Sequence, residues 1–187
     1  MKKVSFFLLG AAFLASSLAF VAPKNPKAPI TLAVQSDKSR VDFIGSKAAD
    51  FHTGTFAVKG GSVQVEGGKL VGGSFVIDLA NLKVTDAAGE RLAGHLKSAD
   101  FFDVAKFGEA VYTISSVDYS SATACKINGT LNIKGVGVPV SFASNIRSAS
   151  EKGLFGQAYF SLDRTLLGIA YAGPSKDVQI AVHLFAK

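Results

Sequence analysis

The stretch Glu90-Arg-Leu-Ala-Gly-His-Leu-Lys-Ser-Ala-Asp-Phe-Phe-Asp103 decides the fold, because it is the one convincing helix in a chain of 187 residues. The rest of the chain has the patterns of strands and turns. Leu92, Leu96 and Ala99 lie at positions i, i+4 and i+7, which places them along one side of a helix. The pattern predicts one short helix near residues 88–98.

The end of this helix carries two adjacent aromatic residues, Phe101 and Phe102, between Asp100 and Asp103. A short helix that ends in paired aromatics can lie across the end of a β-structure as a lid. The alternative is a packing helix with a solvated basic face. We interpret Asp100 and Asp103 as turn-forming residues and not as paired catalytic carboxylates.

Apolar and polar residues alternate along most of the remaining chain. Val41 and Phe43, for example, alternate with Arg40 and Asp42. This period of two is typical of strands with one buried face and one exposed face. Many short-linked strands and one helix predict an all-β fold, either a closed antiparallel barrel or a sandwich. Turns are expected at Gly60-Gly61, Gly67-Gly68 and Lys134-Gly-Val-Gly137.

The N-terminus has the pattern of a targeting segment. Lys2 and Lys3 precede an apolar run, and Ser17-Leu-Ala19 supplies small residues for cleavage after Ala19. We expect a signal peptide at 1–19, a tether rich in proline and lysine at 20–29, and one domain at 30–187. The protein would then be exported to the periplasm or secreted, and an uncleaved membrane anchor is the alternative.

The formal net charge of +6 is mild. It favours a membrane surface only weakly, so transient membrane contact is an expectation. Without blocks of like charge or aromatic–basic motifs, no nucleic-acid partner is predicted. The oligomeric state stays open.

Three motifs resemble those of the YceI-like family. Gly94-His-Leu-Lys-Ser-Ala-Asp-Phe-Phe-Asp-Val104 is similar to its signature. Asn128-Gly-Thr-Leu-Asn-Ile-Lys-Gly135 resembles its hairpin, and Leu162-Asp-Arg-Thr-Leu-Leu-Gly-Ile169 resembles a late motif. The resemblance implies an extended, lipocalin-like antiparallel β-barrel of about eight strands, with the helix capping one end. It also implies a bound polyisoprenoid, isoprenoid quinone or similar long-chain lipid.

Residues with catalytic or metal-binding chemistry are scattered. No nucleophile elbow, phosphate-binding loop or zinc motif occurs. His52, His95 and His183 lack metal-ligand spacing, and Cys125, the only cysteine, fits a small packed residue. We therefore predict no catalytic residues, no metal and no cofactor.

The mature region holds many phenylalanines, which could fill a core or line a tunnel. We favour non-enzymatic binding or transport of a long-chain amphiphilic lipid in an apolar tunnel, because a barrel of this size can enclose a small ligand. Two alternatives remain: a structural or partner-binding barrel with a packed interior, and an enzyme that uses His95 or His52 on a bound lipid. Arg91, His95 and Lys97 are the candidates for contact with a polar head group. The predicted tunnel and lid residues are Phe43, Phe75, Leu92, Leu96, Phe101, Phe102, Phe142 and Phe160.

Overall fold

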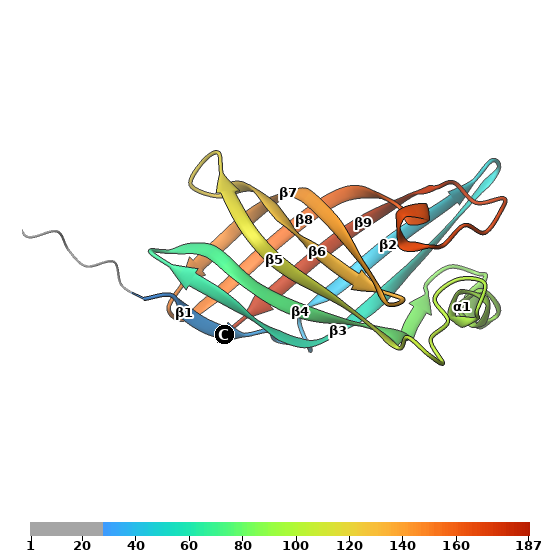
Figure 1. Cartoon of the computed structure of the whole chain (residues 1–187), viewed down its shortest axis with the longest axis horizontal. Helices are drawn as coiled ribbons and strands as arrows, with labels where there is room; N and C mark the ends of the chain where they lie inside the picture. The colour runs from blue at the N-terminus through green and yellow to red at the C-terminus, as the bar shows by residue number, and fades with distance from the viewer. Residues whose placement is uncertain (1–27) are drawn as a thin grey trace, which may run out of the picture.

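A computed structural model describes residues 28–187 (Figure 1). Eight antiparallel strands close into one barrel, because β4 pairs with both β5 and β3. The predicted all-β, lipocalin-like barrel is therefore confirmed. The strands of the barrel are β2 (Arg40–Lys47), β3 (Asp50–Glu66), β4 (Lys69–Val84), β5 (Glu109–Tyr119), β6 (Ala124–Ile133), β7 (Val136–Ser150), β8 (Gly153–Asp163) and β9 (Asp177–Ala186).

A short additional strand, β1 (Ile30–Ala33), pairs with the second half of β3, while β2 pairs with the first half. The backbones of Ala33 and Lys187 exchange two hydrogen bonds of 2.9 Å each. The start and the end of the described chain are thus joined at the same end of the barrel (Figure 1).

The strands β3 and β4 are long and approach each other closely. A Cβ atom at Gly61 would come within 2.2 Å of the Ser74 carbonyl oxygen, and one at Gly73 within 2.4 Å of the Ser62 oxygen. Glycine is required at both positions, since any side chain would displace the neighbouring backbone. The turn expected at Gly60-Gly61 is wrong: β3 continues through these residues, and the register shifts between Val58 and Gly60. The glycines mark a bulge in a long strand.

The helix α1 (Gly89–Lys97) lies between β4 and β5 at the opposite end of the barrel (Figure 1). It confirms the predicted helix and is one residue shorter at each end. Ala99 lies beyond the helix and is exposed, so the prediction that it belongs to the apolar side of the helix is wrong. The buried residue of the helix is Ala93. The short 3₁₀ helix η1 (Arg164–Leu167) follows β8 at this same end.

Small and branched apolar side chains fill the half of the barrel that contains β1. Val63, Val65 and Leu70 are each at most 3% exposed. Cys125 is also buried, and this burial raises the pKa of its thiol above the usual range. The cysteine therefore packs in the core as expected. The other half of the barrel, beneath α1 and η1, is not filled in this way and encloses a cavity.

Candidate functional site

A cavity occupies the half of the barrel that lies beneath α1 and η1. Its volume is about 210 Å³, counted as the space that the centre of a water molecule can occupy. Its wall comes from inward-facing residues of the strands, from α1 and from the segments that follow α1 and β8. Seven of its lining residues are phenylalanines, namely Phe43, Phe56, Phe75, Phe101, Phe102, Phe142 and Phe160.

The structure places all eight of the predicted tunnel and lid residues on the wall of this cavity. Leu92 and Leu96 reach it from one face of α1, and Phe101 and Phe102 from the turns that follow. The alternation of residues along the strands accounts for the other four, because one face of each strand points into the barrel. Phe56 and Tyr112 also line the cavity, and the same alternation would have identified them.

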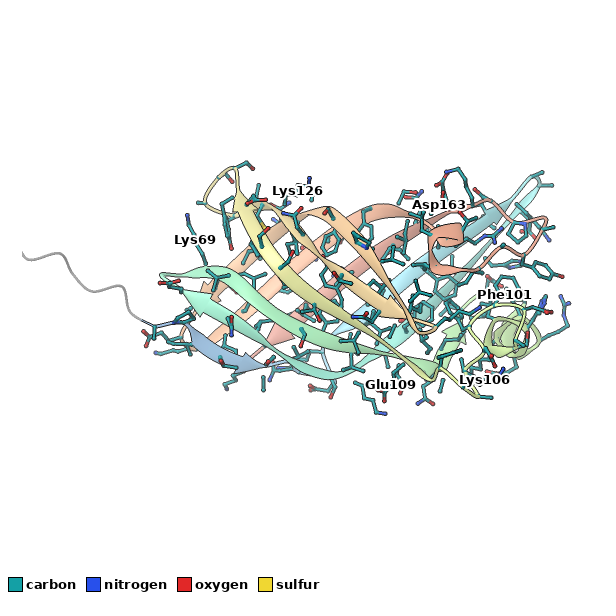
Figure 2. The ribbon with its side chains drawn as sticks, viewed as in Figure 1. Lys69, Phe101, Lys106, Glu109, Lys126 and Asp163 are labelled. Carbon is teal, nitrogen blue, oxygen red and sulfur yellow. The ribbon has the colours of Figure 1, made fainter. Side chains whose placement is uncertain are left out.

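The segment of residues 98–104 closes the cavity beside α1. Phe101 lies beside α1 (Figure 2) and is only 7% exposed. Lys134 donates a hydrogen bond from its Nζ atom to the Phe101 carbonyl oxygen. Phe102 meets Phe56 edge to face at 5.6 Å between ring centroids. Tyr171, in the loop before β9, lies 4.8 Å from Phe101. Aromatic contacts therefore join the lid to that loop.

The polar residues of the wall gather at the same end of the barrel. Ser46 and Lys47 end β2, His52 begins β3, and Arg164 and Ser175 lie on η1 and the loop after it. The Ser175 amide donates to the Ser46 carbonyl oxygen at 2.7 Å, which brings these segments together. Apart from the Tyr112 hydroxyl, the other side chains on the wall are apolar. The cavity is therefore an apolar chamber with a polar rim.

Arg164 is 8% exposed and organises this rim. Its guanidinium donates to the carbonyl oxygens of Ile169, Tyr171, Pro174 and Ser175 at 2.6–2.9 Å. No carboxylate within residues 28–187 forms an ion pair with it. Asp163 instead accepts from the backbone and hydroxyl of Thr165, and these contacts lower the pKa of the Asp163 carboxyl. Asp163 and Arg164 thus hold the start of η1 and the following loop in place through hydrogen bonds.

His52 and Asp86 form a pair beside the cavity, with 3.3 Å between Nδ1 and the nearer carboxylate oxygen. Asp86 also accepts from the amides of Ala88 and Thr53. These two amides, followed by His52, lower the pKa of the Asp86 carboxyl. The carboxylate thus ties the beginning of β3 to the approach to α1, where no side chain caps the helix at Ala88.

The three predicted head-group residues lie on α1 and do not line the cavity. Arg91 is exposed, and His95 lies 3.4 Å from Asp100 and stacks edge to face on Tyr171. Lys97 is half-buried on the helix. The basic residues that do reach the wall are Lys47, His52 and Arg164. No sequence pattern marks these three as a group, because they meet only when the barrel closes.

Within residues 28–187, the histidine, cysteine and acidic residues form no group that could hold a metal ion. No helix in this part of the chain is long and apolar enough to cross a membrane. The predicted signal peptide and most of the tether lie outside the described residues.

Solved structures with the same fold include three bacterial proteins. *Burkholderia cenocepacia* BcnA is 18% identical, with a TM-score of 0.70 over 82% of this chain and 99% of that protein. A polyisoprenoid binding domain from *Saccharophagus degradans*, implicated in plant cell wall breakdown, is 16% identical, with a TM-score of 0.66 over 83% and 97%. The *Campylobacter jejuni* YCEI protein is 14% identical, with a TM-score of 0.54 over 96% and 99%.

At these identities, the structural comparisons establish the fold alone. No curated protein matches the chain. The model of the YceI-like domain family matches residues 32–186, which is nearly all of the barrel. The chain therefore belongs to the YceI-like family.

Proposed function

We propose that this protein binds a long-chain amphiphilic lipid, such as a polyisoprenoid or an isoprenoid quinone, with its tail in the apolar chamber. The observation that carries the proposal is a cavity of about 210 Å³ with an apolar wall and a polar rim at one end. The *Saccharophagus degradans* protein, whose barrel is similar, is described as a polyisoprenoid binding domain, and this supports the same class of ligand.

The energetics of such a site suit a lipid tail. Each methylene group removed from water contributes roughly 0.8 kcal/mol, so a tail of ten or more carbons is retained without specific polar contacts. Polar groups are needed only where the head group lies. Membership of the YceI-like family supports lipid binding. Transport of the lipid between sites is a further part of the same proposal.

The head group would lie against the polar rim. Arg164 contributes a positive charge without a carboxylate partner in the described chain, although its hydrogen bonds go to backbone carbonyls. Lys47 and His52 retain exposed side-chain atoms, at 50% and 28%. We therefore assign head-group contact to Lys47 and His52 in place of Arg91, His95 and Lys97, and we expect a preference for anionic or hydrogen-bond-accepting heads.

An enzyme acting on the bound lipid is the second candidate, because His52 meets a carboxylate at the cavity. Such a pair can orient a histidine as a general base. However, the contacts of His52 run to Asp86 and, at 3.9 Å, to Asp50, and no hydroxyl or thiol within residues 28–187 is hydrogen-bonded to it. Asp86 is also held by two backbone amides. This arrangement supports a structural and head-group role without catalysis.

A packed barrel that binds a protein partner is the third candidate. The half of the barrel around Val63 and Leu70 fits this description, but the cavity beneath α1 does not.

Exposed apolar residues near the rim support loading of the lipid from a membrane, since Phe51 is 60% and Leu166 is 58% exposed. Export to the periplasm or the cell exterior remains part of the proposal.

Native mass spectrometry of the purified protein, followed by organic extraction, tests the proposed function. We expect a bound species of lipid mass that denaturation releases. Delipidated protein should also take up a long-chain isoprenoid alcohol, and His52→Gln should weaken the uptake of an isoprenoid phosphate more than that of the alcohol. A folded protein that carries no lipid and takes up neither probe would refute the proposal.

A further inference from the structure

A layer of aromatic side chains crosses the barrel at the floor of the chamber. We call Phe75, Tyr112 and Phe142 the aromatic floor. The Tyr112 ring centroid lies 5.7 Å from that of Phe75 and 5.4 Å from that of Phe142. Phe142 also stacks on Phe160 at 4.4 Å. The floor thus joins β4, β5, β7 and β8 through the inside of the barrel.

A second, smaller chamber lies on the other side of this floor. Its volume is about 30 Å³, and its wall includes Leu70, Ile114 and Leu184 from the β1 half of the barrel. All three residues of the floor line both chambers. The floor is therefore the wall between a large chamber that reaches the rim and a small one that does not.

Tyr112 is the fixed member of the floor. It is 3% exposed, and its hydroxyl donates to the Val140 carbonyl oxygen at 2.9 Å, across β6. Gly129 of β6 leaves the space for this crossing, since a Cβ atom there would lie 2.6 Å from the Tyr112 ring and hydroxyl. If the ring swung away, the buried hydroxyl would lose its acceptor, which opposes movement. Phe75 and Phe142 have no such anchor.

We propose that Tyr112 determines the length of the lipid tail that this protein accepts, by stopping the tail at the aromatic floor. The inference rests on the proposed function. A water-sized group needs about 15 Å³, so the chamber holds roughly 14 such groups, and a methylene group is of similar size. An isoprene unit has five carbons, so the tails that fit best should contain about three isoprene units. The second chamber becomes available only when Tyr112 is removed.

The test is a competition between isoprenoid alcohols of different length. Delipidated full-length protein is equilibrated with geraniol, farnesol, geranylgeraniol and solanesol in a mild non-ionic detergent. The protein is then re-isolated, and the bound alcohols are extracted and quantified by mass spectrometry. Ratios are compared between variants, so that partition into the detergent cancels.

The wild type should hold farnesol and gain little from the longer geranylgeraniol and solanesol. Tyr112→Ala should raise the bound ratio of solanesol to farnesol about tenfold or more, since each further buried isoprene unit adds several methylene equivalents. Tyr119→Ala is the matched control. Tyr119 is also a tyrosine with a hydrogen-bonded hydroxyl, which accepts from the Leu70 amide at 2.8 Å, but it lines neither chamber, so the ratio should stay within about twofold of the wild type.

The outcomes separate the two proposals. If the wild type binds none of the alcohols, the proposed function fails and the inference fails with it. If the wild type binds them, but the Tyr112→Ala ratio equals that of the wild type or Tyr119→Ala shifts it equally, the inference is overturned and the lipid site stands. Tyr112→Leu, which keeps apolar bulk but is shorter, replaces Tyr112→Ala if that variant fails to unfold cooperatively.

Discussion

Replacing Arg164 with methionine should loosen the loop that forms much of the polar rim. The substitution keeps an unbranched side chain of similar length but removes every N–H donor. Four carbonyl oxygens, those of Ile169, Tyr171, Pro174 and Ser175, would lose their partner. No other single substitution removes so many contacts from the rim.

The expected cost follows from where those carbonyls lie. Ile169 is 2% exposed, so its oxygen would stay buried and unpaired at a cost of about 1–3 kcal/mol. The other three residues are exposed or partly exposed, and water can replace the lost donors. Each of these hydrogen bonds then contributes only its net value of roughly 0.5–1.5 kcal/mol. We expect Arg164→Met to lower the free energy of unfolding by about 4 kcal/mol.

Urea unfolding, together with hydrogen exchange of residues 168–176, measures this effect. Arg147→Met is the control, because Arg147 lies exposed on β7 and makes one side-chain hydrogen bond, to Gln157 at 3.1 Å. It should cost less than about 1 kcal/mol. Arg164→Lys should fall between the two, since an ammonium group has three donors and lacks the planar fork. If Arg164→Met costs no more than Arg147→Met and loop exchange is unchanged, the reasoning is wrong.

The remaining predictions concern the lid, two titrating groups and the N-terminus. Phe101→Asp should abolish retention of extractable lipid and destabilise the fold by about 3–5 kcal/mol; a folded variant that keeps its lipid would contradict the lid role. The pKa of the Asp86 carboxyl is lower in the folded protein than its ordinary value of 3.8, so the charged carboxylate stabilises the fold. This stabilisation is fully present above pH 3.8 and is lost as the pH falls through the pKa of the folded state. Urea unfolding of Asp86→Asn between neutral pH and pH ~3 should therefore show a smaller loss of stability in acid than the wild type, and an equal loss would contradict the assignment. Burial raises the pKa of Tyr112 to about 12, so stability should fall as the pH rises from the ordinary 10.0 towards 12; Tyr112→Phe should remove the corresponding late step from the ultraviolet absorbance titration, and an unchanged titration would refute the assignment. N-terminal sequencing of the mature protein should begin at Phe20, and an intact Met1 would support the anchor instead.

The strands and the helix could be predicted because their signals are local. Alternation in residues such as Val41 and Phe43 reports which face of a strand is buried, and the spacing of Leu92 and Leu96 reports one face of α1. The choice of a barrel over a sandwich came from the resemblance to the YceI-like family. Closure depends on the pairing of β2 with β9, the first and last strands of the barrel, which no local pattern encodes. The bulge at Gly60-Gly61 was misread as a turn, since adjacent glycines suit both structures.

The apolar side of the candidate site could be predicted better than its polar side. Aromatic residues on inward-facing strand positions line a barrel whichever strands pair with each other. Phe43, Phe142 and Phe160 could therefore be predicted without knowing which strands are neighbours. The rim is assembled from residues more than a hundred positions apart, such as Lys47 and Arg164. Arg91 was chosen as a basic residue near the lid, yet it is exposed and does not line the cavity. Side-chain direction on a short helix depends on what the helix packs against.

The pairing of Ala33 with Lys187 gives the barrel a blunt end at which both ends of the folded domain can be held. A surface, a resin or a fused protein attached through either end would sit on the side away from α1 and η1 (Figure 1). Molecules immobilised in this way would present their openings in one direction, each at about the same height above the support. A sensor layer or an affinity matrix built from this protein would therefore keep its binding chambers accessible without any change to the barrel.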